Sequence, residues 1–197
     1  DIGDSAGSGI PNIFYTWKQH GWSEPTIKQT VHPNRIEFLL PLMKRGDKVT
    51  VCHVANGNMG HEIIKPDELR AMRAGEAKRA GAMAGIEVIS AGFDDLKIYD
   101  GNKEARDRIV DVIRYANPDF IITHNPDDYM PDHTAVSRLV FDASFTATLP
   151  NYKSKYEKPA KLVPIYYMDI LAGVNFNPTE YVDISDEIDL KLKMLEC

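Results

Sequence analysis

The chain has 197 residues, of which 43% are apolar and 26% charged, and its formal net charge is −6. This length suits a single α/β domain of ordinary size, and an acidic chain without clustered Lys and Arg is not expected to bind nucleic acid. No apolar run reaches the roughly 18 residues of a membrane span, and no secretion signal is recognisable. We therefore expect a cytoplasmic protein that acts on small molecules and has no membrane segment. Cys52, which lies inside an apolar run, is interpreted as a buried thiol.

Residues 1–42 differ in character from the rest of the chain. They predict one short helix ending at Gly21, then two extended pieces around the turn-forming stretch HPNR. We therefore expect a separate N-terminal segment, 1–42, followed by one domain, 43–197.

From residue 43 onward, strands are expected to alternate with helices. The first expected helix, 66–84, starts at Pro66 and carries Leu69, Met72, Ala80 and Met83 on one stripe. The next is expected at 103–116, where Asn117-Pro118 stops it. The other expected helices are 132–143 and a last one bearing Ile188, Leu192 and Leu195, and the expected strands are 48–55, 85–92, 119–125, 164–171 and 180–185.

This alternation predicts an α/β, Rossmann-like fold with a mostly parallel sheet and helices on both faces. In such sheets ligands bind beyond the carboxyl ends of the strands. The loops NGNMGH, FDDLKIYDG and HNPDDYMPDH should therefore meet at one rim.

The stretch DDYMPDH, residues 127–133, combines three carboxylates with an imidazole at the start of a predicted helix. A hydrolytic zinc site uses three such ligands and a water, and this loop can supply one or two of them. Taken alone, the stretch is more typical of an acidic helix start, where carboxylates favour the positive end of the helix dipole, than of a metal site.

The chain from Met43 to Cys197 resembles the LmbE-like or PIG-L-type N-acetylglucosamine deacetylases, which are zinc hydrolases. The matching pieces are GDKVTVCHVANGNMG, ELRAMRAGEAKRAGAMAG, FDDLKIYDG, ITHNPDDYMPDH and TEYVDIS. The resemblance implies removal of acetyl from a small glucosamine-containing conjugate, with Zn as cofactor, and it favours a homo-oligomer because related deacetylases often assemble.

The resemblance also implies roles for individual residues. His133 falls on a zinc ligand, and Asp132 falls on the aspartate that holds the catalytic imidazole; Asp128 is a further catalytic candidate. Arg73 and Glu76 fall near the substrate, as do Asn56 and Gly57. A surface ion pair for Arg73 and Glu76, and a plain turn for Asn56 and Gly57, are the alternatives.

Two departures from the family pattern are visible. Met130 stands where the family has a second histidine, which acts as an electrophile or general acid. The family's opening strand, with its His-Pro-Asp-Asp motif for two zinc ligands and the general base, is absent, and VHPNR at residues 31–35 is the nearest counterpart. Residues 7–42 instead resemble the tail of a GHKL-type ATP-binding module of transcriptional regulators.

Three functions follow from these patterns. The first is a deacetylase-family hydrolase, and the second is a catalytically inactive α/β domain that binds a sugar conjugate or a protein. The third is a regulator fragment in which residues 1–42 are the functional part.

Overall fold

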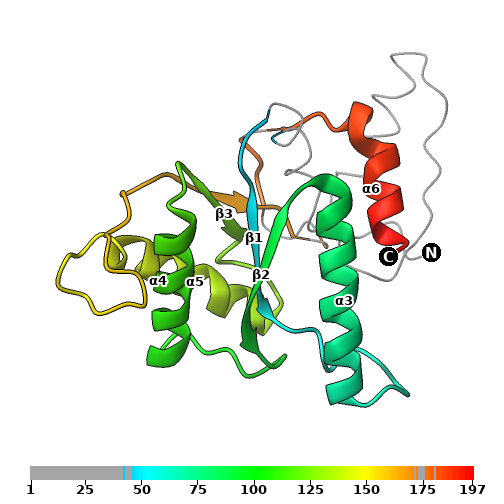
Figure 1. The fold of residues 1–197 in the computed structure, drawn as a ribbon, viewed down its shortest axis with the longest axis horizontal. Helices are drawn as coiled ribbons and strands as arrows, with labels where there is room; N and C mark the ends of the chain where they lie inside the picture. The colour runs from blue at the N-terminus through cyan, green and yellow to red at the C-terminus, as the bar shows by residue number, and fades with distance from the viewer. Residues whose placement is uncertain (1–41, 43–45, 171, 173–175, 180) are drawn as a thin grey trace.

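The computed structural model describes residues 42, 46–170, 172, 176–179 and 181–197. The expected N-terminal segment, 1–42, thus lies outside the described residues except for Leu42. Strands and helices alternate along the described chain as expected (Figure 1). Among the described residues, no helix is long and apolar enough to cross a membrane.

The four described strands pair in parallel, which confirms the expected α/β class. β1 (Thr50–Ala55) pairs with β2 (Glu87–Phe93), and β3 (Ile121–His124) pairs with β4 (Ile165–Met168). Within the described chain these are two separate two-stranded sheets, whereas one continuous sheet was expected. Each strand is shorter than the stretch of sequence that predicted it, because only residues paired with the neighbouring strand belong to it.

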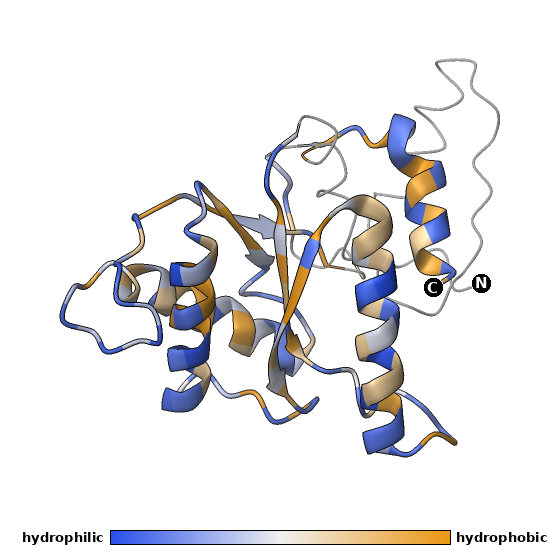
Figure 2. Cartoon of the chain, viewed as in Figure 1, coloured by the Kyte–Doolittle hydropathy of each residue, from blue (hydrophilic) through white to orange (hydrophobic). Residues whose placement is uncertain are grey.

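Helices cover both faces of the β1–β2 pair, as expected. On one face α3 (Pro66–Ala84) and α6 (Ile188–Leu195) pack around Val49, Ile86 and Met194. On the other face α4 (Lys103–Ala116) and α5 (Pro131–Thr146) form the larger core with Val54 and Ala91. Figure 2 shows the apolar residues of β2 running between α3 and α4.

Helix α3 has the expected bounds but a different buried face. It begins with Pro66 and ends at Gly85, whose φ of 66° closes the last turn in the left-handed conformation. Its buried residues are Leu69, Gly81 and Ala84, so the expected apolar stripe is confirmed at Leu69 and wrong at Met72 and Met83, which are 43% and 53% exposed. Ala80 of the stripe is partly buried against the core of Val49, Ile86 and Met194. Small residues face the sheet because the helix lies close to it; a Cβ on Gly81 would come within 2.4 Å of Val88 Cγ2.

Helix α4 is capped at both ends by asparagine. Asn102 Oδ1 accepts hydrogen bonds from the amides of Glu104 and Ala105, and Asn117 ends the helix with a φ of 43°. Helix α5 starts one residue before the expected bound and ends three residues after it, since Pro131 suits the first helical position.

The C-terminal part departs most from expectation. The strand expected at 180–185 was wrong where the structure describes it: Tyr181–Ile184 join no ladder, Tyr181 is 84% exposed, and Ser185–Glu187 form the 3-10 helix η1. Helix α6 exists, but the expected stripe of Ile188, Leu192 and Leu195 is exposed while Lys191 and Met194 are buried. The buried face of the helix thus differs from the prediction: Met194 packs with Val49 and Ile86, and the helix lies mainly against α3.

One buried cation fixes the long connection between α5 and β4. Arg114 is 6% exposed, and its guanidinium donates to the carbonyls of Ala147, Leu149, Tyr152 and Tyr156 at 2.7–3.1 Å. Four carbonyl acceptors satisfy a charge that would otherwise be costly to bury, so this loop is anchored on α4.

Candidate functional site

Three polar side chains meet where β3 ends. His124 is the last residue of β3, Asp128 lies in the following loop, and His133 is the third residue of α5. Each offers one ligand atom, and these atoms all lie within 4.8 Å of one another. Two residues that the sequence analysis singled out, His133 and Asp128, thus lie together, and His124 joins them as a member that the sequence analysis missed.

Asp128 orients His133. Its Oδ2 lies 2.8 Å from His133 Nδ1, and its Oδ1 accepts the Met130 amide at 2.9 Å. Burial alone would raise the pKa of Asp128, but the hydrogen bonds from Met130 and His133 and the charges of the two imidazoles hold that pKa below its usual value. A carboxylate that accepts from Nδ1 places the lone pair of the His133 ring on Nε2, which is the common pattern around metal-binding histidines.

The two imidazoles stack. The rings of His124 and His133 have centroids 4.1 Å apart and planes within 5° of parallel. Zinc–nitrogen bonds of about 2.0–2.1 Å place tetrahedral ligands about 3.4 Å apart. The donor types fit zinc, but an ion between parallel rings would lie outside at least one ring plane, so one ring has to tilt to coordinate it.

Asp132, expected to be catalytic, points elsewhere. Its Oδ2 accepts the Leu96 amide at 2.7 Å, so the carboxylate ties the start of α5 to the loop after β2. Leu96 is 60% exposed and has a φ of 63°, a conformation that is uncommon without glycine and often marks a functional site. Both residues line a surface cavity of about 360 Å³.

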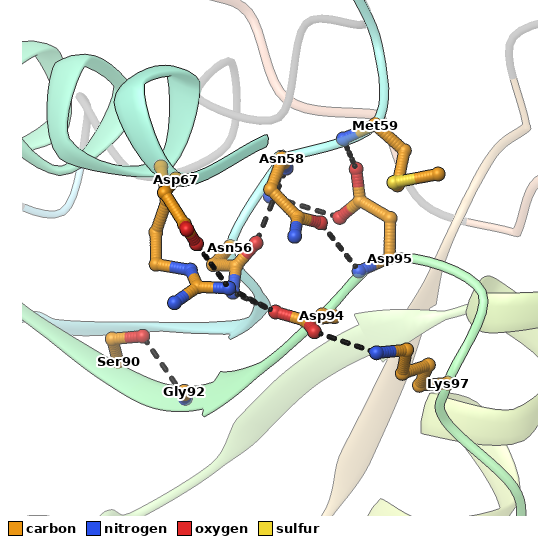
Figure 3. Close-up of polar contacts among 11 residues, drawn as sticks. Asn56, Asn58, Met59, Asp67, Ser90, Gly92, Asp94, Asp95 and Lys97 are labelled. Atoms are coloured by element: carbon orange, nitrogen blue, oxygen red, sulfur yellow. Dashed lines mark hydrogen bonds and ion pairs between the residues drawn. The ribbon is translucent and has the colours of Figure 1, made fainter. Parts of the chain in front are cut away.

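The loops after β1 and β2 are joined by a hydrogen-bond network (Figure 3). Asn56 Nδ2 donates to Asp94 Oδ1 at 2.9 Å, and Arg70 Nη2 reaches the same oxygen at 2.7 Å. Asp95 accepts the amides of Gly57 and Met59. The hydrogen bonds from Asn56 and then Lys97, with the charges of Lys97 and Arg70, lower the pKa of Asp94 to about 2. Asn56 and Gly57 are thus held in place by two aspartates that the sequence analysis had not singled out.

The expected substrate-binding residues on α3 lie beside this network. Arg73 and Glu76 form an ion pair at 2.8 Å, with about a third of each side chain exposed. A Cβ on Gly57 would meet Arg73 Cγ at 3.4 Å, so the glycine, with a φ of 74°, lies directly over the arginine. Asn56, Gly57, Arg73 and Glu76 therefore form one group, separate from the His124–Asp128–His133 cluster.

The structure also shows the surroundings of Met130 and Cys52, two residues that the sequence analysis discussed. Met130 caps the start of α5 and is 39% exposed, so the position next to the cluster is open but carries no ionisable group. Cys52 packs against the larger core, and its burial, partly offset by a backbone hydrogen bond from Ala91, raises its pKa to about 11. This agrees with an unreactive thiol, which is partly rather than fully buried.

Residues 37–144 match the family PIG-L, described as GlcNAc-PI de-N-acetylase. The chain belongs to this family. The matched range holds β1 to β3, the loops after them and nearly all of α5, so it includes the whole His124–Asp128–His133 cluster.

The similar proteins include two kinds of enzyme. A 4-oxalmesaconate hydratase of Pseudomonas putida KT2440 is 27% identical over 163 residues, which cover 78% of this chain and 63% of the hydratase. The crystal structure of GalB, the 4-carboxy-2-hydroxymuconate hydratase of the same strain, aligns with a TM-score of 0.73 at 22% identity, over 83% of this chain and 71% of GalB.

The N,N'-diacetylchitobiose deacetylase of Pyrococcus horikoshii aligns with a TM-score of 0.70 at 22% identity, over 83% of this chain and 63% of the deacetylase. These structural likenesses confirm the fold. The chain spans less than two-thirds of the length of its curated hydratase relative. None of the relatives named here supports the expected GHKL-like character of residues 7–42.

Proposed function

We propose that this chain belongs to a zinc-dependent enzyme that adds water to a small substrate, acting as a hydrolase of an N-acetyl group on a glucosamine-containing conjugate. The observation that carries the proposal is the meeting of His124, Asp128 and His133 at the carboxyl end of β3. In an α/β fold this is the place where ligands bind. The family description supports the acetyl-amide substrate.

Each residue of the cluster has a distinct task in this proposal. His133 would hold the ion through Nε2 while Asp128 holds its ring through Nδ1, and His124 would supply a second nitrogen. A bound zinc ion would lower the pKa of a ligated water and polarise the substrate carbonyl. Asp132 keeps Leu96 and its loop over the start of α5, so it acts here as a positioning residue.

A second candidate function is hydration of an unsaturated carboxylic acid. The curated relative is a hydratase, and Met130 provides no proton donor at the position where the resemblance places the deacetylases' second histidine. Hydration and amide hydrolysis both require an activated water, so the same cluster serves either reaction.

The test combines metal analysis with two activity assays on the full chain. We expect close to one equivalent of zinc, and we expect release of acetate from N,N'-diacetylchitobiose that is lost in His133→Ala and in His124→Ala. Hydration of 4-carboxy-2-hydroxymuconate without acetate release would establish the second function. If the protein held less than a tenth of an equivalent of zinc, and His133→Ala did not affect sugar binding, both enzymatic functions would be refuted. The chain would then be the catalytically inactive binding domain.

A further inference from the structure

A surface groove of about 500 Å³ lies between the start of α4 and the exposed face of α5. Two arginines line it, Arg106 on α4 and Arg138 on α5, together with the buried Ser137 and the aromatic rings of Phe141 and Tyr167. The groove is close to the metal cluster along the chain. Pro126, two residues after His124, lines one side, and Ser137 lies one helical turn beyond His133.

One nitrogen of the Arg106 guanidinium lacks a hydrogen-bond acceptor among the described residues. This nitrogen, Nε, is buried. The nearby carboxylate of Asp107 already accepts from Lys103 Nζ and from Tyr152 Oη, both at 2.5 Å. A buried N–H without an acceptor destabilises a fold, and turning this guanidinium into the groove would break no hydrogen bond of Nε.

The second arginine, Arg138, forms an exposed ion pair whose carboxylate a ligand could replace. Arg138 Nη1 lies 2.9 Å from Asp100 Oδ2, and the two side chains are 63% and 47% exposed. Ion pairs this exposed contribute little, so a ligand carboxylate can replace Asp100 at small cost. Asp142 also faces the groove from α5, but it is exposed and therefore screened by water.

We propose that this groove binds a small unsaturated or otherwise flat carboxylic acid, with Arg106 as the principal anchor. A guanidinium presents a planar pair of N–H groups that matches a carboxylate, and the rings of Phe141 and Tyr167 supply apolar surface for the carbon chain. The inference rests on the proposed function only for the statement that such a ligand is a substrate. In that case it favours the hydratase reaction.

The test is calorimetric titration of the full chain with trans,trans-muconate in the presence of EDTA, so that the metal cluster takes no part. Dimethyl muconate is the uncharged probe and inorganic phosphate is the alternative anion. We expect muconate to bind, and Arg106→Met to weaken it about tenfold or more, since a hydrogen bond to a charged group is lost. Lys161→Met, which removes the same charge outside the groove, should leave binding unchanged.

The thermal midpoint of Arg106→Met should be unchanged or higher, because the substitution removes an unsatisfied donor; this keeps a loss of binding separate from a loss of fold. Equal binding of the dimethyl ester, equal binding of phosphate, or unaltered muconate binding by Arg106→Met would each overturn the proposal. If the protein contained no zinc as purified, before EDTA was added, and still bound muconate, the proposed function would be contradicted and this inference would stand.

Discussion

Replacing Asp128 with asparagine is expected to change which ring nitrogen of His133 carries the proton. The carboxylate accepts two hydrogen bonds, at Oδ1 from the Met130 amide and at Oδ2 from His133 Nδ1. Asparagine keeps one acceptor, and the backbone amide can only donate. The amide oxygen therefore stays with Met130, and the new NH₂ group faces Nδ1, which must then accept, so the proton moves to Nε2.

The magnitude follows from that tautomer change. A metal needs the free lone pair of Nε2, and removal of a hydrogen-bond partner of a ligating histidine typically lowers metal affinity by about 10–100-fold. That loss corresponds to about 1.4–2.7 kcal/mol of binding free energy. If Asp128 were itself the ligand, the loss would exceed this range, so the size of the effect distinguishes the two roles.

The measurement is competition for zinc against a chromogenic chelator, together with ¹⁵N chemical shifts of the His133 ring without metal. Asp127→Asn is the matched control, because Asp127 is the exposed neighbour in the same loop. We expect wild-type affinity from the control. An unchanged tautomer in Asp128→Asn, or the same loss of affinity in Asp127→Asn, would refute the reasoning.

Other consequences of the structure can be measured separately. Arg114→Met should lower the free energy of unfolding in urea by about 3–5 kcal/mol, since it leaves buried carbonyls without donors, whereas Lys103→Met, which breaks only an exposed ion pair at the start of α4, should cost less than about 1 kcal/mol. Cys52 should resist alkylation at pH 8 in the folded chain and react in urea, because its pKa is raised to about 11. Asp94 has a pKa lowered to about 2, so its contribution to stability is complete above its ordinary pKa of 3.8 and should fade in acid titration as the pH approaches 2; Asp94→Asn should flatten that part of the profile. Met130→His should raise the rate of acetate release if amide hydrolysis is the reaction, and it should leave a hydratase unchanged or slower.

The sequence predicts the described helices well and the buried faces less well. Apolar spacing, Pro66 and Asn117 locate α3 and α4, because local propensity and capping depend on neighbours in the chain. Which face of α3 is buried depends on how close the sheet lies, and this is determined by tertiary packing rather than by the local sequence. Spacing alone favoured Met83 as a buried residue, whereas the structure places Gly81 against Val88.

The candidate site shows the same division. His133 and Asp128 could be predicted because they lie in one compact motif, and their hydrogen bond is local. His124 was missed because it is the last residue of a strand, and a histidine that ends an apolar run is more often part of the core. Only the folded loop brings it close to His133, which lies nine residues later in the chain. Asp94 and Asp95 were missed because their hydrogen-bond partners Asn56, Gly57 and Met59 lie 36–38 residues earlier in the chain, in the loop after the neighbouring strand.

Each of the two strand pairs carries one half of the rim, and hydrogen bonds between the loop after β2 and α5 link the two halves, among them the bond from Arg138 Nη1 to Asp100 Oδ2. The β1–β2 half is locked by Asn56 and Asp94, and the β3 half contains His133. Between them, Leu96 from the loop after β2 donates to Asp132 at the start of α5. Because Leu96 holds a left-handed φ of 63°, this bond keeps a loop in a conformation that it would otherwise leave. Asp132 thus ties the loop after β2 to the start of α5, beside the His124–Asp128–His133 cluster. Under the proposed function, Asp132→Ala should therefore weaken substrate binding more than zinc affinity.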